Sequence, residues 1–226
     1  MTQAENLIDR LAAIDTPTLS NAIEKLEVRS PVAGFWGRDM RCLFPDLGVM
    51  CGYAVTAQVE TMNPDEPGRL GQAWWDVCQA VQEKDAPTVV VMQEIGPAPG
   101  FSTHCGEVMA TTFQRLGAVG VVSDSGVRDL SEVHALGFRY FAPGCVPSHA
   151  NFRLVRAQVP VSICGVEVSP GDLLHGDANG LIKVPEHGRD RLPELAAAVT
   201  RAEKVVLDFV KGNDFNLDGL RERMRH

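Results

Sequence analysis

The chain has 226 residues, of which 45% are hydrophobic and 22% charged, as is typical of a globular protein with a sizeable buried core. Its formal net charge of −8 argues against nucleic acid or an anionic membrane as a partner, since neither attracts an acidic surface. The first residues carry acids and no basic stretch before an apolar run, so we expect no secretory leader, and no apolar run of about 18 residues suggests a membrane span. Its six cysteines are scattered without CxxC pairs, which favours free thiols and a cytoplasmic location.

The start of the chain predicts two short helices. Apolar residues recur at helical spacing over residues 5–14. The next segment, DTPTLSNAIEKL (15–26), carries a helix start signal, with Asp15 or Thr16 as N-cap and Pro17 at the first helical position.

A strand, a loop and a third helix are predicted next. YAVTAQVE (53–60) alternates as a strand does, and ETMNPDEPGR (60–69), with two prolines and a glycine, predicts a loop. GQAWWDVCQAVQEKD (71–85) has the spacing of a helix that buries Trp74 or Trp75, and we interpret this tryptophan pair as helix core.

The middle of the chain alternates between strands and helices. The predicted order is a strand over 86–94, a Gly/Pro-rich loop from 96, a helix from about Gly106, a strand over 118–124, a short helix over 129–137 and a strand over 138–144. The first of these strands is apolar enough to lie buried on both faces of a sheet. Such alternation favours a parallel α/β layer.

The pattern changes from residue 154. Short strands separated by SPGD and GDANG turns predict a small antiparallel or barrel-like layer over 154–188. Apolar residues from Leu192 to Phe209 then follow helical spacing, and a polar tail closes the chain. We expect a single domain over 1–226, with residues 189–226 docking on the core or on a neighbouring subunit.

One group of charged residues points to a ligand site. Twenty residues separate Glu107 from the Arg128–Asp129 pair, which is enough for one helix, one turn and one strand. In a parallel α/β layer, the loop before that helix and the loop after that strand lie at the carboxyl edge of the sheet, where ligands bind. We therefore expect Glu107, Asp124, Arg128 and Asp129 to meet around one small ligand. The alternative is a solvated loop with a surface ion pair.

The helix predicted after Gly106 would add an anion-binding element. The first N–H groups of a helix lack partners within the helix and bind anions such as a carboxylate. Gly106 would let a ligand approach the backbone closely. The alternative is that Glu107 only complements the helix dipole.

Two blocks of the sequence carry a family resemblance. GEVMATTFQRLGAVGVVSDSGVRD (106–129) and VPVSICGVEVSPGDLLHGDANGLIKVP (159–185) resemble the RraA-like superfamily, which includes metal-dependent class II pyruvate aldolases of the 4-hydroxy-4-methyl-2-oxoglutarate type. The resemblance spans roughly residues 16 to 186. It implies the swivelling β/β/α fold of that family, with a central mixed sheet, helices and a small antiparallel layer. The family signature is an acidic residue, twenty residues and then Arg-Asp.

The resemblance also implies a role for each site residue. Asp129 would bind Mg²⁺ or Mn²⁺ directly, and Glu107 would hold the metal through water. Arg128 would contact the ketone oxygen of a bound 2-oxo acid, and the backbone amides of Val108 and Met109 would bind its carboxylate. The family usually has Asp at the position of Glu107, so this chain departs from the signature there.

The activity implied is retro-aldol cleavage of a 4-hydroxy-2-oxo acid to pyruvate, with oxaloacetate decarboxylation as a second reaction. A divalent cation and an arginine would both stabilise the enolate charge, and the absence of a lysine from the motifs disfavours a Schiff base. The family forms trimers or dimers of trimers, and its aldolases take an acid from the C-terminal region of a neighbouring subunit. Glu203, Asp208 and Asp214 are the candidates here.

Two alternatives to this activity remain open. One is a non-catalytic regulator of the RraA type that binds a ribonuclease or another protein partner. The other is a lyase of the same fold that acts on a different oxo acid or sugar acid.

His104, Cys105, Cys145 and His149 raise the possibility of a soft-metal site, although their spacing fits no closed zinc pattern. His104 is otherwise interpreted as a loop histidine, or as a substrate contact beside the anion-binding turn.

The remaining charged motifs are interpreted as structural. Asp172 and Asp177 lie in PGD and GDANG segments, where aspartate serves turn formation. Arg38 and Asp39, with Arg41 close by, form a second Arg-Asp pair that we interpret as a solvated loop, although its arginines could meet a distal substrate carboxylate.

Overall fold

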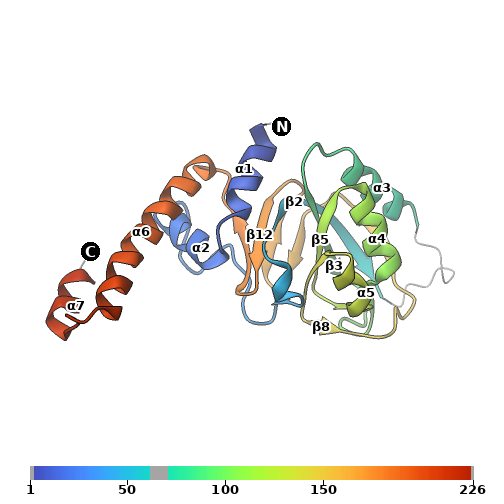
Figure 1. The fold of residues 1–226 in the computed structure, drawn as a ribbon. Coiled ribbons are helices and arrows are strands. Elements are labelled where there is room, and N and C mark those ends of the chain that lie inside the picture. Colours follow the sequence, from blue (N-terminus) through green and yellow to red (C-terminus); the bar gives the residue numbers. More distant parts are fainter. Residues whose placement is uncertain (1–2, 62–70, 225–226) are drawn as a thin grey trace.

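A computed structural model describes residues 3–61 and 71–224 (Figure 1). The predicted loop over 60–69 therefore falls outside the described residues from residue 62 onward. In chain order the elements are α1 (Gln3–Ala12), α2 (Thr16–Glu24), β1 (Arg41–Cys42), η1 (Pro45–Leu47), β2 (Met50–Glu60), α3 (Gln72–Gln82), β3 (Thr88–Glu94), β4 (Thr103–Cys105), α4 (Glu107–Leu116), β5 (Ala118–Ser123), β6 (Gly126–Val127), α5 (Leu130–Ala135), β7 (Arg139–Ala142), β8 (Gly144–Cys145), β9 (Arg153–Ala157), β10 (Val161–Ile163), β11 (Val166–Val168), β12 (Leu173–Asp177), β13 (Gly180–Val184), η2 (Arg189–Arg191), α6 (Leu192–Lys211) and α7 (Leu217–Arg223).

A mixed sheet forms the centre of the fold. Its strands are ordered β1-β7-β5-β3-β2-β12-β13, and β9 also pairs with β2. Strands β2, β3, β5 and β7 are parallel, whereas β1, β9, β12 and β13 join antiparallel. The two ends of the sheet approach each other, since β1 contacts β13. The predicted α/β class with a parallel layer is confirmed, and most of the antiparallel strands extend the same sheet.

The helices lie where the sequence predicted them, with small differences. Helix α2 begins at Thr16 with Asp15 as its N-cap, so Pro17 occupies the second helical position and not the first. The Asp15 carboxylate accepts the Thr18 N–H at 2.9 Å, which satisfies one of the free donors of the first turn. In α3 it is Trp74 that is buried, while Trp75 is 63% exposed.

A second, three-stranded sheet lies beside the carboxyl ends of the main strands. It is parallel, ordered β4-β6-β8, and its strands have two or three residues each. The sequence did not predict it, because strands this short show no alternation of apolar and polar residues. This small sheet carries the residues that precede α4 and α5.

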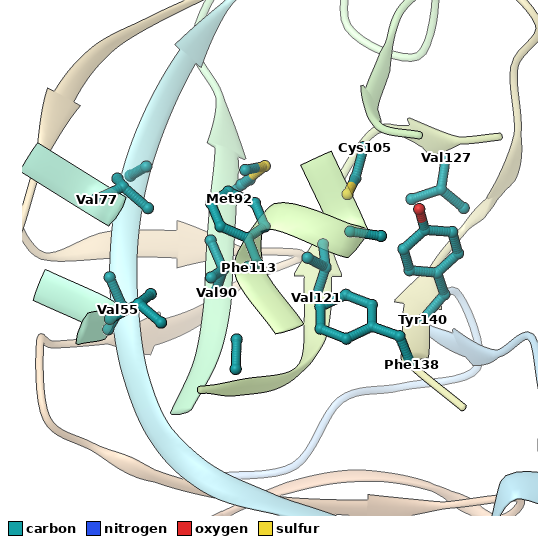
Figure 2. Close-up of a cluster of buried hydrophobic side chains, with 14 of the residues drawn as sticks. Val55, Val77, Val90, Met92, Cys105, Phe113, Val121, Val127, Phe138 and Tyr140 are labelled. Carbon is teal, nitrogen blue, oxygen red and sulfur yellow. The ribbon is translucent and has the colours of Figure 1, made fainter. Parts of the chain in front are cut away.

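One face of the main sheet packs against α3, α4 and α5 through an apolar cluster (Figure 2). Phe113 of α4 and Phe138, which precedes β7, are fully buried within it. Tyr140 extends the cluster beneath the small sheet, and Figure 2 shows its hydroxyl directed toward Cys105 and Val127. The apolar core therefore reaches the strands that carry the predicted site.

The C-terminal helices extend away from the sheet. The first half of α6 packs against α1 and α2 through the buried side chains of Leu192, Ala196 and Val199. Its second half projects beyond the body of the protein and carries α7 at its far end (Figure 1). The polar tail thus contains a helix, α7, that the sequence pattern did not predict.

Two further observations bear on the environment of the protein. The described cysteines are all free, and Cys51, Cys78 and Cys105 are buried. Across residues 3–61 and 71–224, every helix is too short or too polar to cross a lipid bilayer.

Candidate functional site

The candidate site lies at the end of the small parallel sheet. Strand β4 leads through Gly106 into α4, and β6 leads through Arg128 and Asp129 into α5. The N–H of Arg128 donates to the carbonyl of Cys105 at 3.0 Å, so the two connections leave the sheet side by side. The predicted meeting of the two loops at the carboxyl edge of parallel strands is therefore observed, although on the small sheet.

Asp129 links the two helices. Its carboxylate Oδ2 accepts the backbone N–H of Glu107 at 2.8 Å, and the Nε of Arg128 lies 3.5 Å from the same oxygen. The residue adopts a left-handed backbone, with φ 58° and ψ 47°, a conformation that aspartate tolerates better than most residues. This backbone turns its carboxylate toward α4 and away from its own helix, whose N-terminus receives no side-chain cap from it.

Gly106 is required by this close packing. A Cβ atom added there would lie 2.5 Å from Oδ2 of Asp129 and 2.9 Å from Nε of Arg128. The requirement is steric and not conformational, because the backbone of Gly106 is extended, at φ −126° and ψ −172°.

These residues surround a small cavity of about 80 Å³. Except for Asp124, every residue that the sequence placed in the site lines this cavity, together with four others. The lining residues are Thr103, Cys105, Gly106, Glu107, Val108, Met109, Arg128, Asp129, His149 and Phe152. Thr103 and Cys105 belong to the unpredicted strand β4. Phe152 lies in the loop between β8 and β9, and no sequence signal pointed to it.

The cavity presents donors for an anion. Within the described part of the chain, the N–H groups of Val108 and Met109 form no hydrogen bond, as expected for the first turn of a helix. The Nε of Arg128 is buried and also without a hydrogen-bond partner, while its Nη1 donates to the carbonyl of Pro147 at 3.3 Å. A bound carboxylate or ketone oxygen would satisfy these donors.

The donor set also fits a divalent cation. Among the described residues, no group of three or more His, Cys, Asp or Glu side chains is gathered closely enough to hold a metal. Mg²⁺, however, retains several waters and commonly uses only one or two protein carboxylates. Asp129 is partly exposed, its Oδ1 has no hydrogen bond among the described residues, and the exposed Glu107 lines the same cavity. Asp129 and Glu107 therefore suit a hydrated hard cation.

Asp124 does not belong to the lining of the cavity, so its predicted place around the ligand is wrong. Its Oδ1 instead accepts the N–H of Glu94 at 2.7 Å and ties the end of β5 to the end of β3. Burial raises the pKa of this carboxyl to about 6, against the opposing effect of the hydrogen bond from Glu94.

His104 is not a loop histidine, because it lies within β4 with its side chain fully buried. Its Nε2 is 2.9 Å from Oε2 of Glu94, and its Nδ1 is 2.9 Å from Oγ of Ser123. It does not line the cavity, which removes the interpretation as a substrate contact. No cluster of three metal-binding side chains is found among the described residues, so the soft-metal hypothesis gains no support from the structure.

The structural interpretation of the other motifs is confirmed. Asp172 accepts the N–H of Ser169 at 2.8 Å, and Asp177 accepts the N–H of Asn179 at 2.8 Å, as turn-forming aspartates do. Arg38 and Asp39 are exposed in a loop, whereas Arg41 is exposed but lies in the strand β1 and not in the loop.

The RraA-like family model, described as Aldolase/RraA, matches residues 16–183, so the chain belongs to the RraA-like family. A curated relative, an uncharacterised protein of Methanocaldococcus jannaschii, is 28% identical over 127 residues, which cover 55% of this chain and 61% of that protein. The matched part therefore spans less than two thirds of the archaeal relative. A protein of Halalkalibacterium halodurans named as a 4-hydroxy-4-methyl-2-oxoglutarate aldolase is 26% identical over 153 residues, covering 66% of this chain and 71% of the relative.

Solved structures show the same fold. An uncharacterised protein from Pseudomonas syringae pv. tomato superposes with a TM-score of 0.75 at 21% identity, covering 100% of this chain and 96% of that one. RraAS2 of Streptomyces coelicolor, described as an unusual member of the RNase ES inhibitor RraA protein family, has a TM-score of 0.63 at 25% identity and covers 88% of this chain and 93% of its own. The family thus contains proteins named for catalysis and proteins named for inhibition.

Proposed function

We propose that this protein is a divalent-metal-dependent carbon–carbon lyase that cleaves a 4-hydroxy-2-oxo acid to pyruvate and also decarboxylates oxaloacetate. The observation that carries the proposal is the junction of Glu107, Arg128 and Asp129 around one cavity, joined by the hydrogen bond from the Glu107 N–H to Asp129. Membership of a family with aldolases, and a relative named as a 4-hydroxy-4-methyl-2-oxoglutarate aldolase, support it.

The reaction places specific demands on the site. In the retro-aldol direction the C4 hydroxyl loses its proton, the C3–C4 bond breaks, and its electron pair passes to the C2 ketone oxygen to form an enolate that is then protonated at C3. Oxaloacetate decarboxylation generates the same enolate and releases carbon dioxide. Both reactions therefore need positive charge near the ketone oxygen and a fixed substrate carboxylate.

The residues of the cavity match these demands. Mg²⁺ or Mn²⁺ held by Asp129, with Glu107 reaching it through water, would supply Lewis-acid stabilisation of the developing negative charge. Arg128 would direct its Nε–H, which makes no hydrogen bond, toward the ketone oxygen of the substrate. The free N–H groups of Val108 and Met109 would hold the substrate carboxylate at the N-terminus of α4.

We further propose that a neighbouring copy of the chain completes this site, in a trimer or a dimer of trimers. Val108, on the rim of the cavity, is 80% exposed, which is unusual for an apolar side chain. The candidate acids Glu203 and Asp208 lie on α6, at the opposite end of the molecule from α4 and α5 (Figure 1). Within one chain they cannot reach the cavity, so only another copy could bring such an acid to it.

The alternative function is a regulator that binds a ribonuclease or another protein and has no catalytic role. The observation that favours it is the structural likeness to RraAS2, which is described within an inhibitor family. A protein-binding surface alone would not require a buried Arg128 Nε that lies beside the Asp129 carboxylate without a hydrogen bond.

A direct assay separates these functions. Purified protein should release pyruvate from oxaloacetate and from 4-hydroxy-4-methyl-2-oxoglutarate in the presence of Mg²⁺ or Mn²⁺, and EDTA should abolish the release. A panel of other 4-hydroxy-2-oxo acids and sugar acids would identify a different preferred substrate. Absence of metal-dependent turnover on the whole panel would leave the regulator as the better account. Sedimentation velocity would test the oligomer, since a monomer at assay concentration would contradict the shared site.

A further inference from the structure

A buried polar layer lies between the two sheets, directly behind the cavity. It is made by side chains at the carboxyl ends of β3 and β5 and by the strand β4, whose residues Thr103 and Cys105 line the cavity on the other side. His104 is at its centre, and the side chains of His104 and Glu94 are 0% and 1% exposed. A buried ionisable pair is costly unless its hydrogen bonds are complete, so the pair calls for a reason.

The carboxylate of Glu94 is fully hydrogen-bonded. Its Oε1 accepts the N–H groups of Thr61 at 2.9 Å and Gly96 at 2.6 Å. Its Oε2 accepts the Thr61 hydroxyl and the Nε2–H of His104. Although burial alone would raise the pKa of Glu94, the hydrogen bonds from His104 and Thr61 lower it, so the group is a carboxylate.

The other side of the imidazole holds β5 and the approach to β6. Oγ of Ser123 accepts the N–H of Ser125 at 3.0 Å, which leaves its own hydroxyl proton to donate to Nδ1 of His104 at 2.9 Å. Donors and acceptors therefore match when His104 carries its proton on Nε2. The His104 imidazole therefore connects the end of β3 to the end of β5, because it is hydrogen-bonded to Glu94 on β3 and to Ser123 on β5.

The position of the His104 ring determines how β4 is aligned with β6 at the site. Three residues after His104 comes Glu107, and four residues after Ser125 comes Asp129, and these two residues make the hydrogen bond that joins the two helices. The His104 ring also lies beside Phe152 of the cavity wall, with ring centroids 6.3 Å apart. A displacement of the ring would thus shift β4 against β6 and move the wall of the cavity.

We infer that His104, oriented by Glu94 and Ser123, is a positioning residue that sets the geometry between Glu107 and Asp129 through its two hydrogen bonds. It acts through the strands and touches no substrate. The inference rests on the proposed function for its kinetic consequences, and on the structure alone for the geometry.

Two substitutions at His104 separate hydrogen bonding from packing. A glutamine amide carries a donor nitrogen and an acceptor oxygen on either side of one carbon, as the two imidazole nitrogens flank Cε1, so His104→Gln can keep both bonds, whereas His104→Leu fills the space and loses both. His175 provides the matched control. It is equally buried, with Nδ1 3.1 Å from Oγ1 of Thr16 and Nε2 3.1 Å from the carbonyl of Leu11, but it lies on β12 away from the cavity.

His104→Leu weakens Mn²⁺ binding and lowers kcat by about 10- to 100-fold, the usual loss when a residue that orients a metal ligand is removed. It also shifts the amide resonance of Glu107 in an NMR spectrum of the metal-free protein. His104→Gln keeps Mn²⁺ affinity, kcat and the Glu107 resonance close to those of the wild type. His175→Leu lowers the melting temperature without affecting Mn²⁺ affinity, kcat or the Glu107 resonance. In the wild type, ¹⁵N shifts should show His104 protonated on Nε2.

Other results would overturn the inference. If His104→Leu leaves the Glu107 resonance and Mn²⁺ affinity unchanged, the layer is only packing. Should the leucine variant not fold, Ser123→Ala removes one of the two bonds and carries the same expectations to a smaller degree. A wild type without lyase activity would remove the proposed function, while the Glu107 resonance would still decide whether His104 positions the site.

Discussion

The backbone N–H of Glu107 donates to the carboxylate of Asp129 at 2.8 Å, across two connections that leave neighbouring strands. Each residue stands at the start of a helix, Glu107 in the first turn of α4 and Asp129 as the N-cap of α5. One carboxylate oxygen, Oδ2, is therefore used for the fold, while Oδ1 makes no hydrogen bond among the described residues and is left for a ligand of the cavity that Asp129 lines. This division of roles makes the site sensitive to small displacements that would not unfold the protein.

Gly106→Ala tests that sensitivity. The added methyl group would lie 2.5 Å from Oδ2 of Asp129, so the carboxylate or the strand must move. We expect kcat/KM for pyruvate release to fall by roughly 100-fold, as for other displacements of about 1 Å, with little change in circular dichroism. Gly144→Ala, in the same small sheet, is the control, because a Cβ there meets nothing within 4 Å. Equal effects of the two substitutions would contradict the close packing described at Gly106.

Arg128→Ala tests the role of the guanidinium group in the cavity. Loss of the Nε–H, which makes no hydrogen bond in the structure, should cost about 2–4 kcal/mol of transition-state stabilisation, as when an oxyanion donor is removed. The fold should persist, since this side chain is 39% exposed and, among the described residues, donates one hydrogen bond, to the carbonyl of Pro147. Steady-state kinetics with oxaloacetate measures the loss. Arg38→Ala, in the exposed second Arg-Asp pair, should have wild-type kinetics. Wild-type rates in the Arg128 variant would remove it from the proposed mechanism.

Glu107 differs from the usual family residue, and its side chain is tested separately from its N–H. Glu107→Gln keeps the hydrogen bond to Asp129 but loses the second carboxylate, so the Mn²⁺ concentration for half-maximal activity should rise by about tenfold. Glu107→Asp should keep or increase turnover. Glu132→Gln is the control, because Glu132 is also an exposed acid in a first helical turn and shares the favourable dipole interaction. The same metal dependence in both glutamine variants would assign Glu107 to the helix dipole alone.

The sequence predicted that Glu107, Arg128 and Asp129 lie together, but it did not predict the sheet that carries them. The twenty-residue interval between Glu107 and Arg128 identifies the pair because a helix and a strand of ordinary length fill it. Strands β4, β6 and β8 escaped because two or three residues are too few to show a period. Their register depends on partners distant in sequence, such as Ser148, whose carbonyl accepts the N–H of Thr103.

The buried polar layer was missed for a related reason. His104 follows a loop rich in glycine and proline, and its partner Glu94 ends an apolar strand, so each side chain reads as solvent-exposed in isolation. In the structure the two side chains are hydrogen-bonded to each other at 2.9 Å, and this pairing allows both to be buried. Likewise, packing alone decides that Trp74 and not Trp75 enters the core, since adjacent residues of one helix compete for the same face.

Asp124 provides a prediction on stability and pH. Burial raises the pKa of its carboxyl in the folded protein to about 6, above the value of an exposed aspartate. Between about pH 4 and pH 6 the folded state then binds more protons at Asp124 than the unfolded state does, so the contribution of Asp124 to the free energy of unfolding falls as the pH rises.

Asp124→Asn keeps an oxygen to accept the N–H of Glu94 and removes the buried charge. We expect the variant to be more stable than the wild type by about 1–3 kcal/mol at pH 7.5, with the difference shrinking toward pH 4. Urea unfolding at both pH values measures it, and Asp39→Asn, at an exposed aspartate, should show no such trend. A loss of stability at pH 7.5 would mean that the ionised carboxylate is needed to hold the ends of β3 and β5 together.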